Sequence, residues 1–251
     1  MQTLIPIYIL VFLYGIVIGS FLNVCIYRIP KGEDIVKTSS HCMNCGHILK
    51  WYDLFPVFSF LALKGKCRYC GIKLSVQYPI IEVFNGILYC FIVGVKGVNA
   101  NSIIYCLFAS ALLTLSVIDF RTMEIPVGIN YFILVLGILH LVLNYRRIWD
   151  YGLGFLSVSA GLFVLYLATK GRAIGGGDIK LMAVSGLLLG VKANFLAFIL
   201  ACILGSVIHI LRMKITKADH VLALGPYLAA SIYISLLWGE KLIAWYMGLF
   251  F

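Results

Sequence analysis

The segment Ala173-Ile-Gly-Gly-Gly-Asp-Ile-Lys180 runs directly into the apolar stretch 181–189. Three glycines precede Asp178, which opens what we expect to be a membrane helix, and glycine leaves room for another segment to approach closely. An ionisable residue at the edge of hydrocarbon is a functional candidate when its partner can be named. Aspartate is also a favoured helix N-cap, whose charge suits the positive end of the helix dipole. This segment alone leaves both interpretations open, and a second carboxylate at the same membrane depth would favour the functional one.

The composition excludes an ordinary soluble protein. Of the 251 residues, 62% are hydrophobic and only 12% are charged, and apolar runs recur from end to end. This balance predicts an all-α polytopic membrane protein. The first apolar segment, 4–26, lacks a basic start and a small-residue cleavage site. We therefore expect it to be a retained helix and not a signal peptide.

The apolar runs predict about eight transmembrane helices. Their expected ranges are 4–26, 80–96, 101–119, 127–144, 152–170, 178–191, 193–212 and 221–239. A count of seven stays open if the sixth and seventh segments form one broken helix. The tail 242–251 is too short to cross a bilayer and could lie in its interface.

The basic residues alternate between the two sides of this topology. The net charge is +10, and with eight spans 15 of the 20 basic residues fall on the side of loop 27–79 and five on the other. Basic residues are enriched in cytoplasmic loops, so the split places loop 27–79 in the cytoplasm and the N-terminus outside. The charge excess therefore indicates topology and predicts no nucleic-acid partner.

This orientation supplies Asp178 with a partner. Asp119 ends the third predicted span, and Asp178 begins the sixth, so both are expected at the cytoplasmic face at similar depth. For Asp119 alone, a solvated residue at a helix end, paired with Arg121, is the simpler interpretation. Two carboxylates at one membrane edge, one of them after a glycine turn, favour a functional pair.

A carboxylate pair offers a specific chemistry. Two carboxyl groups held close together share a proton, so one can act as general base on a water molecule while the other polarises the scissile carbonyl. This is the logic of an aspartic peptidase, here at a position where a substrate helix could dock beside the spans. His140 and His209 lie in apolar segments, where packed histidines with satisfied hydrogen bonds are expected.

Loop 27–79 contains two C-x-x-C motifs, Cys42-Met-Asn-Cys45 and Cys67-Arg-Tyr-Cys70. This spacing, in a reducing compartment, predicts a zinc site formed by four thiolates, with two disulfides as the disfavoured alternative. All four positions around the ion would be filled by protein, so we expect a structural site. A loop of this size builds only a small core, and the metal would supply much of its folding energy.

Several motifs resemble those of the type IV prepilin peptidases. They recur there in the same order, from about residue 15 to residue 190. They are Gly19-Ser-Phe-Leu-Asn-Val-Cys-Ile-Tyr-Arg-Ile-Pro30, the paired C-x-x-C loop, Leu63-Lys-Gly-Lys-Cys67, Tyr78-Pro-Ile-Ile-Glu82, Asp119 followed by Ile125-Pro126, and Gly175-Gly-Gly-Asp-Ile-Lys-Leu181. Two departures are Met43, where the family commonly has proline, and Glu124, where it is often apolar.

The resemblance implies a membrane aspartic peptidase of the G-x-G-D type in the bacterial cytoplasmic membrane. Its members remove the basic leader of prepilins and pseudopilins on the cytoplasmic side, and many then methylate the new N-terminus with S-adenosylmethionine. It implies that Asp119 and Asp178 are the catalytic pair and that Gly175 and Gly177 are the signature glycines. It also implies that Cys42, Cys45, Cys67 and Cys70 bind the metal, and that Gly65, Lys66 and Glu82 belong to the methyltransferase region.

The expected organisation has three parts: a first transmembrane helix (1–26), a cytoplasmic zinc-binding loop domain (27–79) and a transmembrane peptidase core (80–251). S-adenosylmethionine rests on the resemblance alone, because the loop has no G-x-G-x-x-G fingerprint. Glu82 could merely anchor the second span. The alternative is an ion- or proton-coupled transporter that uses Asp119 and Asp178, which would predict acids near mid-span and inverted repeats. An assembly platform without chemistry would leave the G-x-G-D segment unexplained.

Overall fold

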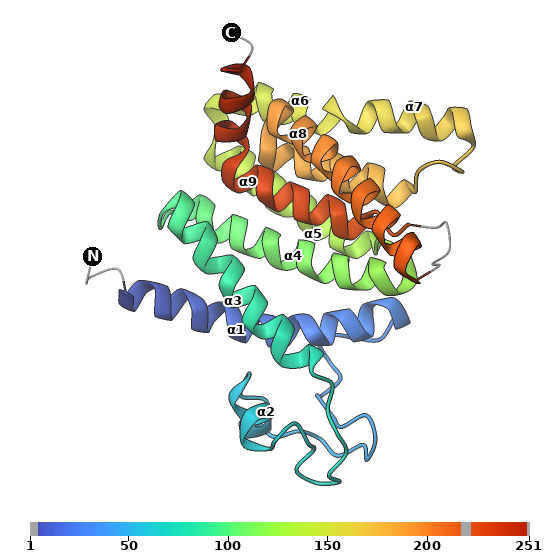
Figure 1. Cartoon of the computed structure of the whole chain (residues 1–251). Helices are drawn as coiled ribbons and strands as arrows, with labels where there is room; N and C mark the ends of the chain where they lie inside the picture. The colour runs from blue at the N-terminus through green and yellow to red at the C-terminus, as the bar shows by residue number, and fades with distance from the viewer. Residues whose placement is uncertain (1–4, 217–221, 250–251) are drawn as a thin grey trace. The chain divides into compact units, whose positions relative to one another are not determined.

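The computed structural model describes residues 5–216 and 222–249 (Figure 1). Some predicted features lie outside the described residues. They are the first residues of two predicted spans (4 and 221), the last two residues of the predicted tail (250 and 251), and Lys217, one of the 15 basic residues on the side of loop 27–79. The chain divides into two compact units, Met1–Ser102 and Ile103–Phe251. The α-helices are α1 (Ile5–Arg28), α2 (Phe58–Ala62), α3 (Gln77–Lys96), α4 (Ala100–Thr122), α5 (Val127–Leu143), α6 (Ile148–Ser157), α7 (Ser159–Thr169), α8 (Gly176–Thr216) and α9 (Gly225–Met247). Described residues form no β-strand, only two isolated bridges in the loop between α1 and α3.

The structure confirms the all-α membrane class but not the predicted count of eight spans, which is wrong. Six helical stretches in the described part are long and apolar enough to cross a membrane, and the apolar helix α5 is shorter. Helix α5 has 17 residues and is therefore about 26 Å long, less than the ~30 Å of hydrocarbon. The segments 178–191 and 193–212 were predicted as two spans and belong to one element, α8. Segment 152–170 corresponds to α6 and α7, which form one apolar stretch from Tyr145 to Thr169.

Helix α8 folds back on itself. Gly190 has φ 76° and ψ 176°, outside the helical region. The Asn194 side-chain amide donates a hydrogen bond to the carbonyl of Met182, 12 residues earlier, at 3.2 Å. A straight helix would separate these residues by about 18 Å along its axis, so the two arms lie side by side (Figure 1). The start and the end of α8 are therefore at the same end of the unit.

Glycines set the packing of α1 against α3 in the first unit. A Cβ atom on Gly15 would lie 2.6 Å from the Cα of Gly86, and one on Gly19 would lie 2.7 Å from the Cα of Glu82. Gly15 and Gly19 are spaced as in the G-x-x-x-G motif, in which small residues let two membrane helices approach closely. The Asn85 amide donates to the carbonyl of Gly15 at 2.8 Å. This contact joins α1 to α3 within the first unit.

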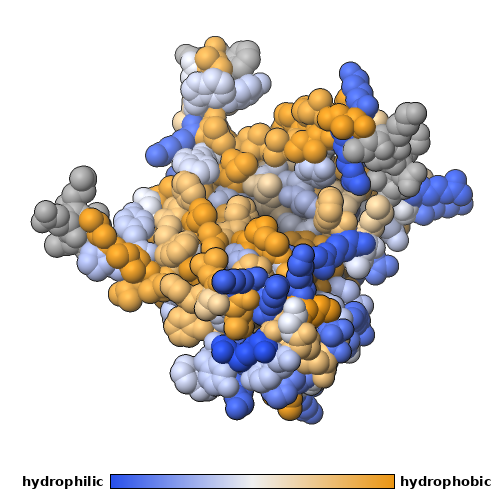
Figure 2. All heavy atoms as spheres, turned by 60° about the horizontal axis from the view of Figure 1, so that its bottom comes forward, coloured by the Kyte–Doolittle hydropathy of each residue, from blue (hydrophilic) through white to orange (hydrophobic). Residues whose placement is uncertain are grey.

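The loop is the hydrophilic part of the first unit. Hydrophilic side chains gather at the front of Figure 2, where the loop comes forward. Arg28 anchors its start: this arginine is buried, and it donates to the carbonyls of Asp34, Thr38 and Ser39 at 2.7–3.2 Å. A buried guanidinium needs such partners, because an uncompensated charge away from water is costly.

His140 is a packed histidine of the second unit, as predicted. Its ring is fully buried, one ring nitrogen lies 2.9 Å from the Tyr105 hydroxyl, and the other lies 3.2 Å from the Leu187 carbonyl. The Leu187 carbonyl can only accept, so the histidine donates to it and accepts from the tyrosine. Both nitrogens of a neutral ring are thereby satisfied. The same prediction is wrong for His209, whose Nδ1 is buried without a hydrogen-bond partner among the described residues.

Candidate active site

Asp119 lies in the last turn of α4 and is buried, with 5% of its surface exposed. Its Oδ2 accepts a hydrogen bond from the backbone N–H of Gly225 at 2.9 Å. Gly225 is the first residue of α9 and is followed by Pro226. The first amides of a helix have no partner within it, and this one is used to bind the carboxylate of another helix.

Asp178 is the third residue of α8 and is half-buried. Its carboxylate accepts a hydrogen bond from the backbone N–H of Gly175. The neighbouring Gly177 packs against the chain after α4, because a Cβ on Gly177 would lie 2.9 Å from the Cβ of Ile125. The glycine-rich segment thus brings the start of α8 against the end of α4.

The two carboxylates consequently lie at one end of the second unit. They are close enough to interact electrostatically, although 59 positions separate them in the sequence. One carboxylate is buried and bound by α9, and the other is partly open to solvent. A water molecule and a peptide carbonyl could meet such a pair, so the arrangement can support acid–base hydrolysis.

Gly225 is a site residue that the sequence reasoning missed. A Cβ there would meet the Oδ2, Cγ and Cβ of Asp119 at 2.6–3.0 Å, and these are the three nearest atoms. The available signal was the Gly225-Pro226 pair at the start of the last apolar segment, because such pairs mark the boundary of an element. Nothing in the sequence relates that boundary to a residue 106 positions earlier.

The four predicted cysteines come together in the loop of the first unit. The Sγ atoms of Cys42, Cys45, Cys67 and Cys70 all lie within 4.8 Å of one another. Cys42 Sγ and Cys70 Sγ are 3.8 Å apart, and two ligands of a tetrahedral zinc ion with Zn–S bonds of about 2.3 Å are also about 3.8 Å apart. The four cysteines are free thiols, so this geometry fits a metal ion.

The backbone around the cluster favours thiolates. The amides of Cys45 and Asn44 donate to Cys42 and lower the pKa of its thiol to about 6, and the amide of Ile72 likewise lowers the pKa of Cys70. Thiolates are the form that binds a metal.

The two cysteine motifs form a structural repeat offset by 25 residues. In each motif the second cysteine is followed by a glycine, Gly46 or Gly71, with φ near 70°. The amide of that glycine donates to the carbonyl of the first cysteine at 2.9 Å in both copies. Only glycine adopts this conformation without strain, so both turns depend on it. No role was predicted from the sequence for either glycine.

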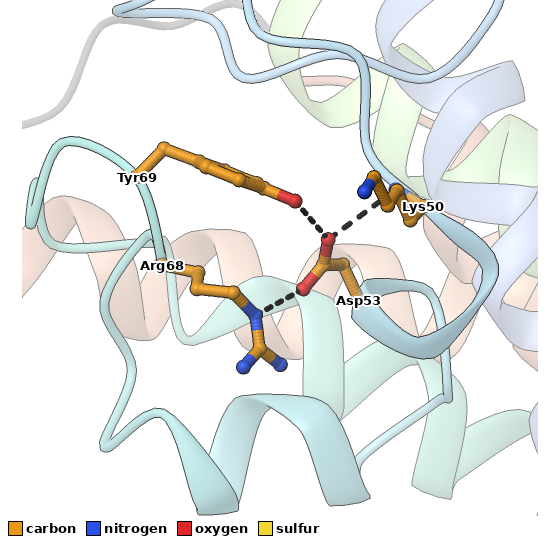
Figure 3. Close-up of polar contacts among 4 residues, drawn as sticks. All are labelled: Lys50, Asp53, Arg68 and Tyr69. Atoms are coloured by element: carbon orange, nitrogen blue, oxygen red, sulfur yellow. Dashed lines mark hydrogen bonds and ion pairs between the residues drawn. The ribbon is translucent and has the colours of Figure 1, made fainter.

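Asp53 connects the segment 50–53 of the loop to the second cysteine motif, a role that was not predicted from the sequence (Figure 3). Its side chain is 3% exposed and accepts from Arg68 Nε at 2.6 Å, from the Tyr69 hydroxyl at 3.1 Å and from the Lys50 amide at 3.3 Å. Burial raises the pKa of Asp53, but these three donors outweigh it and hold the pKa below its ordinary value. The second cysteine motif is therefore tied to residues 50–53 by a charged hydrogen-bond network.

Of the three predicted methyltransferase residues, only Glu82 lines the main cavity of the first unit. This cavity has a volume of about 350 Å³ and lies between the loop and the adjoining ends of α1 and α3. Glu82 is buried and accepts from the Val57 amide at 2.7 Å. Gly65 and Lys66 are not among its lining residues. Gly65 has φ 67° and packs under the ring of Phe60, so its evident role is in the turn.

Comparison with known proteins places both units in one family. The description "Bacterial Peptidase A24 N-terminal domain" matches residues 13–95, and "Type IV leader peptidase family" matches residues 106–210. A protein of Bacillus subtilis named prepilin leader peptidase/N-methyltransferase is 33% identical over 245 residues, covering 95% of this chain and 97% of the relative.

This chain belongs to the type IV leader peptidase family. A Pseudomonas putida protein of the same name is 29% identical over 262 residues, covering 92% of the chain and 90% of the relative. A third one, from Myxococcus xanthus, is 33% identical over 210 residues, covering 82% of the chain and 63% of the relative. No solved structure matches the chain significantly. The matched ranges include the cysteine cluster and both aspartates, whereas Gly225 lies outside them.

Proposed function

We propose that this protein is an aspartic endopeptidase of the membrane that removes the leader peptide of type IV prepilins or pseudopilins and then methylates the new N-terminus. The observation that carries the peptidase assignment is the approach of Asp119 and Asp178 at one end of the second unit. Membership of the leader peptidase family supports the prepilin substrate.

The hydrolysis follows from a carboxylate pair that holds one proton. The ionised carboxylate takes a proton from water as the oxygen attacks the scissile carbonyl, and the protonated carboxyl donates its proton to the carbonyl oxygen. Collapse of the tetrahedral intermediate breaks the C–N bond. The leaving amine takes up a proton from the pair, and one hydroxyl of the intermediate returns its proton to the pair, which again holds one proton. The donor N–H groups of Gly225 and Gly175 hold the two carboxylates in place.

We place this end of the unit and loop 27–79 at the cytoplasmic face of the inner membrane, with the N-terminus outside. The support is the distribution of basic residues, which falls 15 against five when α5 and each arm of α8 cross the membrane. The reversal at Gly190 agrees with it, because it returns the basic end of α8 to the side of Asp178. A prepilin whose apolar helix lies in the bilayer could then present its leader junction to the carboxylates.

We propose that the cysteine cluster binds one structural zinc ion. Its support is the tetrahedral Sγ spacing and the N–H donors that favour thiolates. Zinc would hold the two copies of the repeated turn together and thereby shape the cavity beside them, whose walls include Cys42 and Cys67.

The proposed methyl-transfer site is this cavity. Its volume lies within the range of about 300–1,000 Å³ of small-molecule sites. S-adenosylmethionine, when bound, would supply a methyl group to the free amine of the cleaved pilin. The buried carboxylate of Glu82 suits a cationic sulfonium or ammonium group and could accept the proton that the amine must lose. Lys66 and Gly65 would act only on the loop structure.

The transporter alternative is not favoured. Asp119 and Asp178 lie at one end of their helices and not near mid-span, where a coupled ion site is usually found.

The test is cleavage of a prepilin by the purified protein in detergent. We expect the wild type to release the leader and the Asp178→Asn variant to leave the prepilin intact while retaining the wild-type unfolding temperature. A folded wild-type protein that leaves the prepilin uncut, or an Asp178→Asn variant that cuts at the wild-type rate, would refute the peptidase assignment.

A further inference from the structure

We infer that Gly225 is a positioning residue for Asp119: its N–H binds the carboxylate, and its missing side chain provides the space that this carboxylate occupies. The inference rests on the proposed peptidase function. It adds a third helix, α9, to a site that the aspartates of α4 and α8 define.

The first observation is the hydrogen bond from Gly225 N–H to Asp119 Oδ2 at 2.9 Å. The carboxylate is 5% exposed, so little water can replace this donor. A hydrogen bond to a charged group is stronger than one between neutral groups. It therefore fixes the rotamer of Asp119 as well as its position.

The second observation is steric. A Cβ on Gly225 would lie 2.6 Å from Oδ2, 2.9 Å from Cγ and 3.0 Å from Cβ of Asp119. Gly225 has no positive φ, so its backbone would accept alanine without strain. The contact with Asp119 is therefore what requires glycine here.

The structure offers a matched control, Gly128 in the first turn of α5 in the same unit. A Cβ there would meet nothing within 4 Å. Replacing a helical glycine with alanine raises helix propensity equally at both positions, so a difference between the two variants reports the contact with Asp119.

The kinetic test compares Gly225→Ala with Gly128→Ala in prepilin cleavage. We expect Gly225→Ala to lower kcat by about 100-fold, since a displacement of about 1 Å costs that much, with KM unchanged because the substrate-binding surface is intact. Gly128→Ala should keep the wild-type kcat and KM. A wild-type kcat for Gly225→Ala, or an equal loss in Gly128→Ala, would overturn the inference.

A second measurement is independent of catalysis. Gly225→Ala should lower the unfolding temperature in detergent, and the same change should have a smaller effect in an Asp119→Ala background, where Oδ2 and Cγ are gone and only the Cβ contact is left. An equal loss in both backgrounds would overturn the positioning role. If the wild type fails to cut prepilin and this coupling is still found, then the proposed function is wrong and the Asp119–Gly225 contact is structural.

Discussion

At the scale of single residues, identical side chains take different roles because their surroundings differ. Asp119 is buried and bound by another helix, Asp178 is half-buried in the first turn of its own helix, and Asp53 is buried in a polar network of the loop. Sequence context alone assigned no role to Asp53. Its burial shows that a carboxylate in a polar segment can be a structural centre.

The first prediction concerns the carboxylate pair as one unit. Asp119→Asn and Asp178→Asn should each lower the rate of prepilin cleavage by at least about 10³-fold, and the double variant should be no worse, because residues that act together are not additive. Cleavage rates of the three variants, each with its unfolding temperature, check this. Losses that multiply in the double variant would show that the two aspartates act separately.

The second prediction concerns Asp53. Asp53→Asn should destabilise the loop by about 1–3 kcal/mol, because it removes a buried charged acceptor from three donors. The pKa of Asp53 is held below its ordinary value, so the carboxylate contributes stability above pH ~4 that is lost as the pH falls through the folded-state pKa.

The unfolding temperatures of wild type and Asp53→Asn should therefore differ at pH 7 and converge as the pH falls below 4. The control is Glu33→Gln, since this acid is about half exposed and its nearest cation, Lys31, is 4.0 Å away. That variant should match the wild type at both pH values. A constant difference between wild type and Asp53→Asn from pH 7 to pH 3 would contradict the role of the charge.

At the scale of elements, the glycines at 175–177 matter because of the space that their missing side chains leave to neighbouring groups. Gly177 faces Ile125, where a Cβ would come within 2.9 Å of another Cβ, whereas a Cβ on Gly175 would lie 3.1 Å from the Asp178 carboxylate. Between them, Gly176 faces open space. The three glycines at the start of α8 therefore differ in how well each position would tolerate a side chain.

The third prediction follows from this difference. Gly177→Ala should lower kcat for prepilin cleavage about 10- to 100-fold, because Ile125 has no flexible end at the contact and the helix start must shift. Gly175→Ala should cost less, since the carboxylate can turn, and Gly176→Ala should match the wild type. Kinetics of the three variants decide the order. A loss in Gly176→Ala equal to that in Gly177→Ala would show that backbone freedom, and not space, is what the segment needs.

At the scale of the whole chain, we expect the reversal at Gly190 to give α8 two crossings, one for each arm. Without it, the two ends of α8 would lie on opposite sides of the bilayer. With it, the basic residues near Thr216 lie on the side of Asp178, as the charge distribution requires.

The fourth prediction tests this topology by cysteine labelling in intact cells, on a background without native cysteines outside the cluster. A cysteine at Lys192, beside the reversal, should react with a membrane-impermeant maleimide added outside. Cysteines at Lys214 and Lys50 should react only after the membrane is opened. Labelling of position 192 only after opening and of position 214 from outside would refute the orientation, and labelling of both positions from the same side would refute the reversal.

The fifth prediction concerns the proposed metal. Zinc should be found at one ion per chain, and a strong chelator or Cys42→Ser with Cys67→Ser should remove it and make the loop sensitive to protease, because the metal provides much of the folding energy of a small domain. The second unit should keep its unfolding transition. Metal analysis and limited proteolysis check this. A loop that resists protease without metal would show that the hydrogen bonds of Asp53 and of the backbone are sufficient to fold it.

The sequence by itself determined the helical membrane class, the loop with its cysteine spacing and the identity of both aspartates. These features are local: hydrophobic runs, ligand spacing and a glycine turn beside an acid are each readable within a few residues. The three-part division and the catalytic and ligand roles remain predictions.

Only the tertiary structure decided which distant groups meet. The count of eight membrane-length helices was wrong because hydrophobicity marks apolar length and does not show whether two apolar runs join in one element, as in α8, or how short a helix is, as in α5. Gly225 against Asp119, Asp53 between the arms of the loop and Asn194 against Met182 are contacts over 12 to 106 positions. Contacts of that kind depend on the packing of whole elements, and no local pattern in the sequence encodes them.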